Sequence, residues 1–135
     1  MLKVFVDTAG WIGLIDDADA LQASVQQVMS TLRQQNARLV TTEFVLLEVA
    51  NALSAPAMRT KTVAFINGLR QSPLLQIIPS SQTLLAEGWT LYSQRPDKEW
   101  GLTDCTSVVV MTREQITQAF TSDHHFEQAG FIKLL

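Results

Sequence analysis

Residues 2–8 read LKVFVDT. The apolar part of this stretch is rich in β-branched residues and too short for a helix, so it predicts a buried strand. The stretch ends on Asp7 and Thr8 and continues into residues 9–15, AGWIGLI, which predict a helix. Asp7 then lies at the carboxyl end of a strand, where the ligand crevice of an open α/β sheet is found.

The rest of the chain alternates short apolar runs with longer amphipathic segments. Apolar runs at 38–41, 74–79, 118–121 and 131–135 predict four further strands. Apolar residues at every third or fourth position predict helices at 20–34, 43–53, 58–71 and 80–94, another from 102, and a short helical turn at 124–129. Regular alternation of this kind indicates an α/β fold whose mostly parallel sheet is covered on both faces.

The composition of the chain limits the classes of protein to which it can belong. With 135 residues and 47% hydrophobic content, we expect a single domain over residues 1–135 with a substantial core. The net charge of −3 argues against nucleic-acid binding through bulk positive charge and leaves a local basic patch open. The lone Cys105 cannot form an internal disulfide, no secretory leader opens the chain, and no apolar run reaches the ~18 residues of a membrane span. We therefore expect a soluble, cytoplasmic protein with no membrane segment.

Four acidic residues stand where the predicted fold would bring side chains together, namely Asp7, Glu48, Asp104 and Asp123. Asp7 and Asp123 follow predicted strands, and Asp104 lies in the first turn of the helix from residue 102. Glu48 has apolar neighbours in the helix of residues 43–53, which predicts a position at or near the edge of its buried face. Taken alone, each has a plainer interpretation, such as a helix cap for Asp104 and an exposed side chain for Glu48.

Convergence of these carboxylates would have a chemical consequence. Like charges within a few ångströms oppose one another's ionisation, and a divalent cation is the usual remedy. Oxygen ligands without a set of Cys or His residues suit Mg²⁺ or Mn²⁺ rather than zinc. Such a cation activates water and stabilises charge on a phosphoryl group. The four acids together therefore predict phosphodiester hydrolysis.

The segments that carry these acids resemble those of the PIN-domain ribonucleases, a family that includes the VapC-type toxins of bacterial toxin–antitoxin pairs. The resemblance covers nearly the whole chain and rests on the order and spacing of its parts, none of which is specific alone. The parts are VDT at 6–8, TEF at 42–44, LEV at 47–49, LTDC at 102–105, and TSD at 121–123 followed by Phe126 and Gly130.

The resemblance implies a three-layer α/β/α sandwich and metal-dependent cleavage of single-stranded RNA by a metal-activated water. It also implies a homodimer, and inhibition by a small antitoxin protein that lies across the acidic groove. The matching positions imply that the family's acidic residues are Asp7, Glu48, Asp104 and Asp123 and that its supporting hydroxyls are Thr8 and Thr121. The segment at 97–100, DKEW, resembles that of a branch within the family and has no assigned role.

Several other groups receive simpler interpretations. Asp16, Asp17 and Asp19 are expected to cap the helix that follows them. Neighbouring residues on a helix diverge by about 100°, so His124 and His125 are not expected to hold one metal ion together.

Two basic residues and one aromatic residue have conditional roles. Arg59 and Lys61 are ordinary solvated charges unless the acids form a nuclease site, in which case they are candidates for contact with RNA phosphates. Trp89 is a candidate for an apolar homodimer contact.

Two rival functions use a similar sheet. A receiver-like signalling domain would need paired acids after the first strand and a lysine late in the chain, whereas Asp7 has no acidic neighbour and Lys133 lies inside the last predicted strand. A binding module would use the fold only to hold a partner. Metal-dependent RNA cleavage separates the enzyme from both.

Overall fold

A computed structural model describes all 135 residues and shows five strands and seven helices. In chain order the elements are β1 Lys3–Val6, α1 Thr8–Ile15, α2 Gln22–Gln34, β2 Arg38–Thr42, α3 Glu43–Ala52, α4 Pro56–Leu69, β3 Leu75–Ile78, α5 Gln82–Gln94, α6 Leu102–Arg113, β4 Gln118–Phe120, α7 His124–Gln128 and β5 Ile132–Lys133. None of the helices is both long and apolar enough to cross a membrane.

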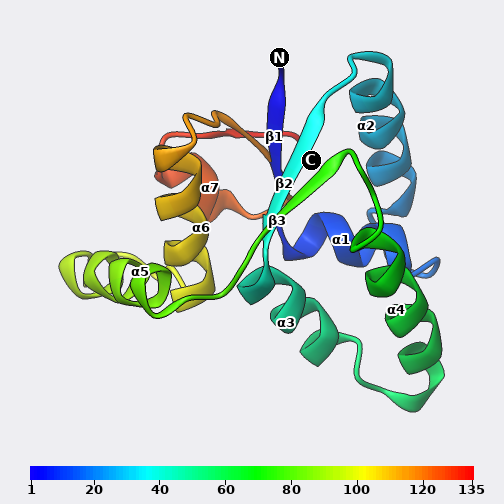
Figure 1. Cartoon of the computed structure of the whole chain (residues 1–135), viewed down its shortest axis with the longest axis horizontal. Coiled ribbons are helices and arrows are strands. Elements are labelled where there is room, and N and C mark those ends of the chain that lie inside the picture. The colour runs from blue at the N-terminus through cyan, green and yellow to red at the C-terminus, as the bar shows by residue number, and fades with distance from the viewer.

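The five strands form one sheet in the order β3-β2-β1-β4-β5, and every neighbouring pair is parallel. Helices α1, α2 and α4 cover one face, and α6 and α7 cover the other with α5 outside them (Figure 1). Helix α3 lies beyond the carboxyl ends of the strands (Figure 1). The predicted three-layer α/β/α sandwich is thus confirmed, with a sheet that is entirely parallel.

The central strand β1 is the most deeply buried part of the sheet. Val4, Phe5 and Val6 have no exposed surface, as expected for a parallel strand covered on both faces. Val6 pairs with Phe120 of β4, and the next backbone N–H, that of Asp7, donates to the Phe120 carbonyl at 3.2 Å. Because β1 and β4 end side by side, the residues that follow them, Asp7 and Thr121, are brought together.

The element boundaries differ slightly from the expected ones. Helix α4 begins at Pro56 instead of residue 58, because proline suits the first turn of a helix. Strand β5 comprises only Ile132–Lys133 instead of 131–135. Even so, Leu134 and Leu135 donate their N–H groups to the carbonyls of Ala119 and Thr121, so backbone pairing with β4 continues beyond the strand.

The close approach of α1 to β4 depends on Gly10. A Cβ at this position would lie 2.4 Å from Phe120 Cδ1 and 2.6 Å from the Phe120 carbonyl oxygen. We predict that Gly10→Ala lowers stability by about 1–3 kcal/mol through overpacking, measured by thermal and urea unfolding. Gly68→Ala is the control, since no atom lies within 4 Å of the added methyl group and alanine favours helix. Equal melting temperatures for the two variants would contradict the prediction.

Candidate active site

Asp7 is the buried centre of the candidate site. It lies between β1 and α1 and is only 3% exposed. Its Oδ2 accepts a hydrogen bond from Thr121 Oγ1 at 3.0 Å, whereas its Oδ1 is buried and has no hydrogen-bond partner. A buried carboxylate oxygen without a donor is costly, so this position would favour a bound cation.

Two further carboxylates face Asp7 from helix starts. Asp104 lies in the first turn of α6, and Asp123 is the N-cap residue of α7. One carboxylate oxygen from each of Asp7, Asp104 and Asp123 lies within 4.8 Å of the other two. The predicted convergence is therefore observed for these three acids.

Both helix-start carboxylates also act as caps. Asp104 Oδ2 accepts the Gly101 N–H at 3.1 Å, and Asp123 Oδ1 accepts the His125 N–H at 2.9 Å. The capping interpretation of Asp104 is thus confirmed, and it does not exclude a role in the candidate site, because a carboxylate has two oxygens and a cap occupies only one. Each of the three acids has its hydrogen bonds on a single oxygen, which leaves the other for a ligand.

Thr121 links the two strand ends. Its side chain is fully buried, its hydroxyl donates to Asp7, and the same oxygen accepts the backbone N–H of Asp123 at 3.1 Å. On the neighbouring strand β2, Thr41 Oγ1 accepts a hydrogen bond from Trp11 Nε1 and donates to the Val6 carbonyl at 2.8 Å. Thr121 therefore has the contacts expected of a supporting hydroxyl, whereas no sequence pattern pointed to Thr41.

Glu48 lies at the exposed one of the two positions that the sequence left open for it. The Glu48 side chain is exposed, and its carboxylate accepts a hydrogen bond from Thr8 Oγ1 at 2.6 Å. The buried face of α3 is formed by Val45, Leu46 and Val49, so Glu48 lies outside it despite its apolar neighbours in sequence. Glu48 lies apart from the compact trio and still acts on Asp7 through its charge.

The electrostatics of the trio favour a cation. Burial raises the pKa of Asp7 to about 7; the neighbouring Thr8 backbone opposes this rise, and the charge of Asp104 reinforces it. Burial also raises the pKa of Asp104, and the Gly101 N–H offsets part of that effect. The charged forms of Asp7 and Asp104, which this environment disfavours, are stabilised when a divalent ion binds.

The donor set fits a hard divalent cation. The three converging ligands are all carboxylate oxygens, and the unpartnered Asp7 Oδ1 is among the groups that a cation would satisfy. Oxygen ligation of this kind suits Mg²⁺ or Mn²⁺. Asp7, Asp104 and Asp123 are therefore the residues that could hold the ion.

The expected divergence of the two histidines was wrong. Their ring centroids lie 4.5 Å apart, and both rings approach the carboxylate of Asp123. The two residues begin a five-residue helix directly after its cap, so ideal mid-helix directions do not describe where their rings lie. His125 Nδ1 lies 3.2 Å from both Asp104 Oδ2 and Asp123 Oδ1, a contact that the sequence analysis missed. The available signal was a histidine two residues after a capping aspartate.

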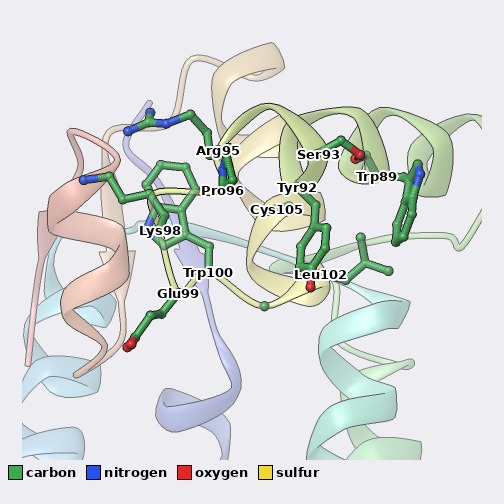
Figure 2. A pocket seen from close by; sticks show the side chains of 11 residues that line it. Trp89, Tyr92, Ser93, Arg95, Pro96, Lys98, Glu99, Trp100, Leu102 and Cys105 are labelled. Atoms are coloured by element: carbon green, nitrogen blue, oxygen red, sulfur yellow. The ribbon is translucent and has the colours of Figure 1, made fainter.

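The loop at residues 95–101 is anchored beside the site. Trp100 is buried, and its Nε1 donates to Gln128 Oε1 of α7 at 3.0 Å, while the Arg95 guanidinium lies 5.0 Å from its ring. Figure 2 shows Trp100 between Arg95 and Lys98 on one side and the aromatic side chains of α5 on the other, around a cavity of about 660 Å³. None of the four acids lines this cavity.

The remaining candidates lie apart from the acids or have local partners. Arg59 donates to the Ser54 carbonyl, and Lys61 forms a 2.8 Å ion pair with Asp17. Trp89 is 57% exposed and stacks on Tyr92 with 5.4 Å between ring centroids. Roles for Arg59 and Lys61 in RNA contact stay predictions.

Comparison with known proteins places this fold and site in a family. The PIN domain family model matches residues 4–132, so the chain belongs to the PIN domain family. Among characterised relatives, the 23S rRNA-specific endonuclease VapC20 of Mycobacterium tuberculosis is 24% identical over 131 residues, covering 97% of each chain. The crystal structure of M. tuberculosis VapC20, described as a toxin that cleaves the sarcin-ricin loop, has a TM-score of 0.83 and 25% identity over 96% of each chain.

More distant solved structures share the fold. VapBC2 of Rickettsia felis, bound to a DNA fragment from its promoter, has a TM-score of 0.71 at 16% identity, covering 98% of this chain and 97% of that one. FitAcB of Neisseria gonorrhoeae has a TM-score of 0.67 at 18% identity, covering 96% and 95%. At these identities the likeness concerns the architecture alone.

The raised pKa of Asp7 predicts a pH-dependent stability. Because the folded pKa of about 7 exceeds the ordinary 3.8, the folded state holds a proton that the unfolded state loses between these values. The free-energy cost of ionising Asp7 in the folded state is absent below pH 3.8, grows as pH rises and is complete above pH 7. It then reaches about 4 kcal/mol, at ~1.4 kcal/mol per pKa unit. Asp7→Asn should therefore be more stable than the parent at pH 8 in EDTA, with the advantage shrinking towards pH 4. Urea unfolding across this range measures it, and parallel pH profiles would count against the prediction.

Proposed function

We propose that residues 1–135 form a single PIN domain that acts as a cytoplasmic, metal-dependent endoribonuclease, the toxin of a toxin–antitoxin pair. Its reaction is hydrolysis of phosphodiester bonds in single-stranded RNA. The observation that carries the proposal is the convergence of the Asp7, Asp104 and Asp123 carboxylates, of which Asp7 also has a buried, unpartnered Oδ1. Membership of the PIN domain family and similarity to the rRNA endonuclease VapC20 over 97% of the chain support it.

The contacts of each residue indicate its role in the proposed reaction. Asp7, Asp104 and Asp123 would hold the cation, with Mg²⁺ as the expected ion and Mn²⁺ as a substitute. When bound, the cation supplies Lewis-acid chemistry that activates water and stabilises phosphoryl charge. Thr121 fixes one oxygen of Asp7 so that the other is available, and the Thr8 hydroxyl holds Glu48 as a fourth acid beside the trio.

The rival interpretations receive less support. Lys133 forms an ion pair with Glu127 at 3.9 Å, whereas a receiver-like domain would direct its late lysine towards the acids. A binding module without nuclease activity would not need three carboxylates close enough to repel one another. The local partners of Arg59 and Lys61 reduce the charge available to RNA, so their contact with phosphates is the weaker part of the proposal.

Cleavage assays test the proposed enzyme directly. Asp7→Asn and Asp104→Asn should each lower Mg²⁺-dependent cleavage of single-stranded RNA by more than about 100-fold, beyond the usual effect of losing a supporting group around a metal. Asp19→Asn is the matched control, because Asp19 caps the Leu21 N–H at 2.8 Å and asparagine caps equally well. Parent-like cleavage by the Asp7 and Asp104 variants would refute the nuclease assignment.

We also propose a homodimer and a small antitoxin as partners. Leu85, Trp89 and Tyr92 lie on one face of α5 at spacings of four and three residues, and all three are exposed. A second copy of the chain is the proposed occupant of this face, while the antitoxin is expected across the acidic groove.

Trp89→Glu should convert the dimer to a monomer, because a charge placed in an apolar interface loses its hydration. Light scattering during gel filtration at tens of micromolar measures the mass. Val63→Glu is the control, since Val63 is also exposed but belongs to α4. A parent protein that is monomeric at this concentration would exclude the proposed dimer.

A further inference from the structure

His125 is held firmly at the edge of the acid trio. It is the second residue of α7, and its side chain is only 17% exposed. The next residue, Phe126, is 1% exposed and stacks on Phe5 of β1 with 6.5 Å between ring centroids. The backbone N–H of His125 donates to Asp123 Oδ1 at 2.9 Å. The imidazole is therefore fixed relative to the sheet and to the cap of its own helix.

One ring nitrogen of His125 contacts carboxylates from two different helices. Nδ1 forms a 3.2 Å hydrogen bond with Asp104 Oδ2 of α6, and it also lies 3.2 Å from Asp123 Oδ1. Ionised carboxylates only accept hydrogen bonds, so the nitrogen between them carries the hydrogen. This holds for the neutral Nδ1–H tautomer as well as for the charged ring. A nitrogen that carries hydrogen cannot bind a cation, so Nδ1 orients the acids instead of joining them as a ligand.

The oxygens that His125 engages are the ones already used as caps. Asp104 Oδ2 also accepts the Gly101 N–H, and Asp123 Oδ1 also accepts the His125 N–H. The second oxygen of each carboxylate is thereby kept available, as Oδ1 of Asp7 is by the bond from Thr121 to Oδ2. Without the imidazole, Asp104 keeps a single backbone donor, Asp123 loses the nearby Nδ1, and both carboxylates gain rotational freedom.

We propose that His125 is a positioning residue that uses Nδ1–H to hold Asp104 and Asp123 at the spacing of cation ligands. This inference rests on the proposed metal-dependent function and assigns a residue to it that lies outside the acidic set. His124 provides the contrast, because its side chain is 67% exposed and its Nδ1 lies 3.8 Å from Asp123 Oδ1.

Replacing His125 by asparagine or by glutamine tests whether the hydrogen-bond donor must lie at the position of Nδ1, because both side chains supply an N–H donor. The side-chain nitrogen of asparagine is bonded to Cγ, as Nδ1 of histidine is, and it has two hydrogens for the two carboxylates. Glutamine places its amide one bond farther out, near the position of Nε2. His125→Asn should therefore preserve the contact, and His125→Gln should lose it.

Calorimetric titration of the metal-free protein with Mn²⁺ tests the inference without an activity assay. His125→Gln should bind Mn²⁺ about 10–100-fold more weakly than the parent, the usual cost of losing a group that orients metal ligands. His125→Asn should bind close to the parent, and the control His124→Gln should be unchanged. Melting curves in EDTA verify that all variants are folded.

The outcomes separate this inference from the proposed function. Parent-like binding by His125→Gln would overturn the positioning role alone, and so would binding by His125→Asn as weak as that of the glutamine variant. A parent protein that binds no Mn²⁺ would overturn both the metal site and the positioning role.

Nitrogen NMR of the parent protein with labelled histidines is a second test. It does not depend on whether the variants fold. A hydrogen on Nδ1 supports the inference, and a hydrogen on Nε2 alone overturns it.

Discussion

The buried hydrogen bond from Thr121 Oγ1 to Asp7 Oδ2 is the interaction on which the site depends. It joins residues 114 positions apart, and it exists because β1 and β4 are parallel neighbours that end together. The backbone bond from Asp7 N–H to the Phe120 carbonyl fixes the register at the same place. Since Thr121 also accepts the Asp123 N–H, a single hydroxyl sets the positions of two of the three converging acids.

This arrangement places an energetic cost at the centre of the protein. Burial of Asp7 raises its pKa to about 7, and the neighbouring charge of Asp104 adds to the effect. The surrounding core, with Phe5, Trp11 and Phe120 fully or almost fully buried, makes the site rigid enough to keep an unfavourable carboxylate in place. The fold therefore gives up stability to hold these carboxylates close together.

Asp104 and Asp123 show how helix capping and a place in the candidate site can coexist. Asp104 lies in the first turn of α6, Asp123 is the N-cap of α7, and each satisfies a backbone N–H with one oxygen. The caps fix the side chains as well as the helix ends, so local helix chemistry contributes to the geometry of the site. The imidazole of His125 then connects the two helix starts to each other.

The sequence by itself determined the alternation of strands and helices, the buried β1 and the grouping of Asp7, Asp104 and Asp123 at one edge. These follow from hydrophobic period and from the rule that parallel strands end at the same edge, both of which are local or topological. Tertiary structure alone decided that Glu48 turns away from the buried face of α3 and pairs with Thr8, and that His125 bridges two acids. Such contacts depend on how helices from distant parts of the chain are rotated and packed against the sheet. The rotation and packing of the helices are fixed by the sum of many core contacts. No residue pattern within one segment predicts them.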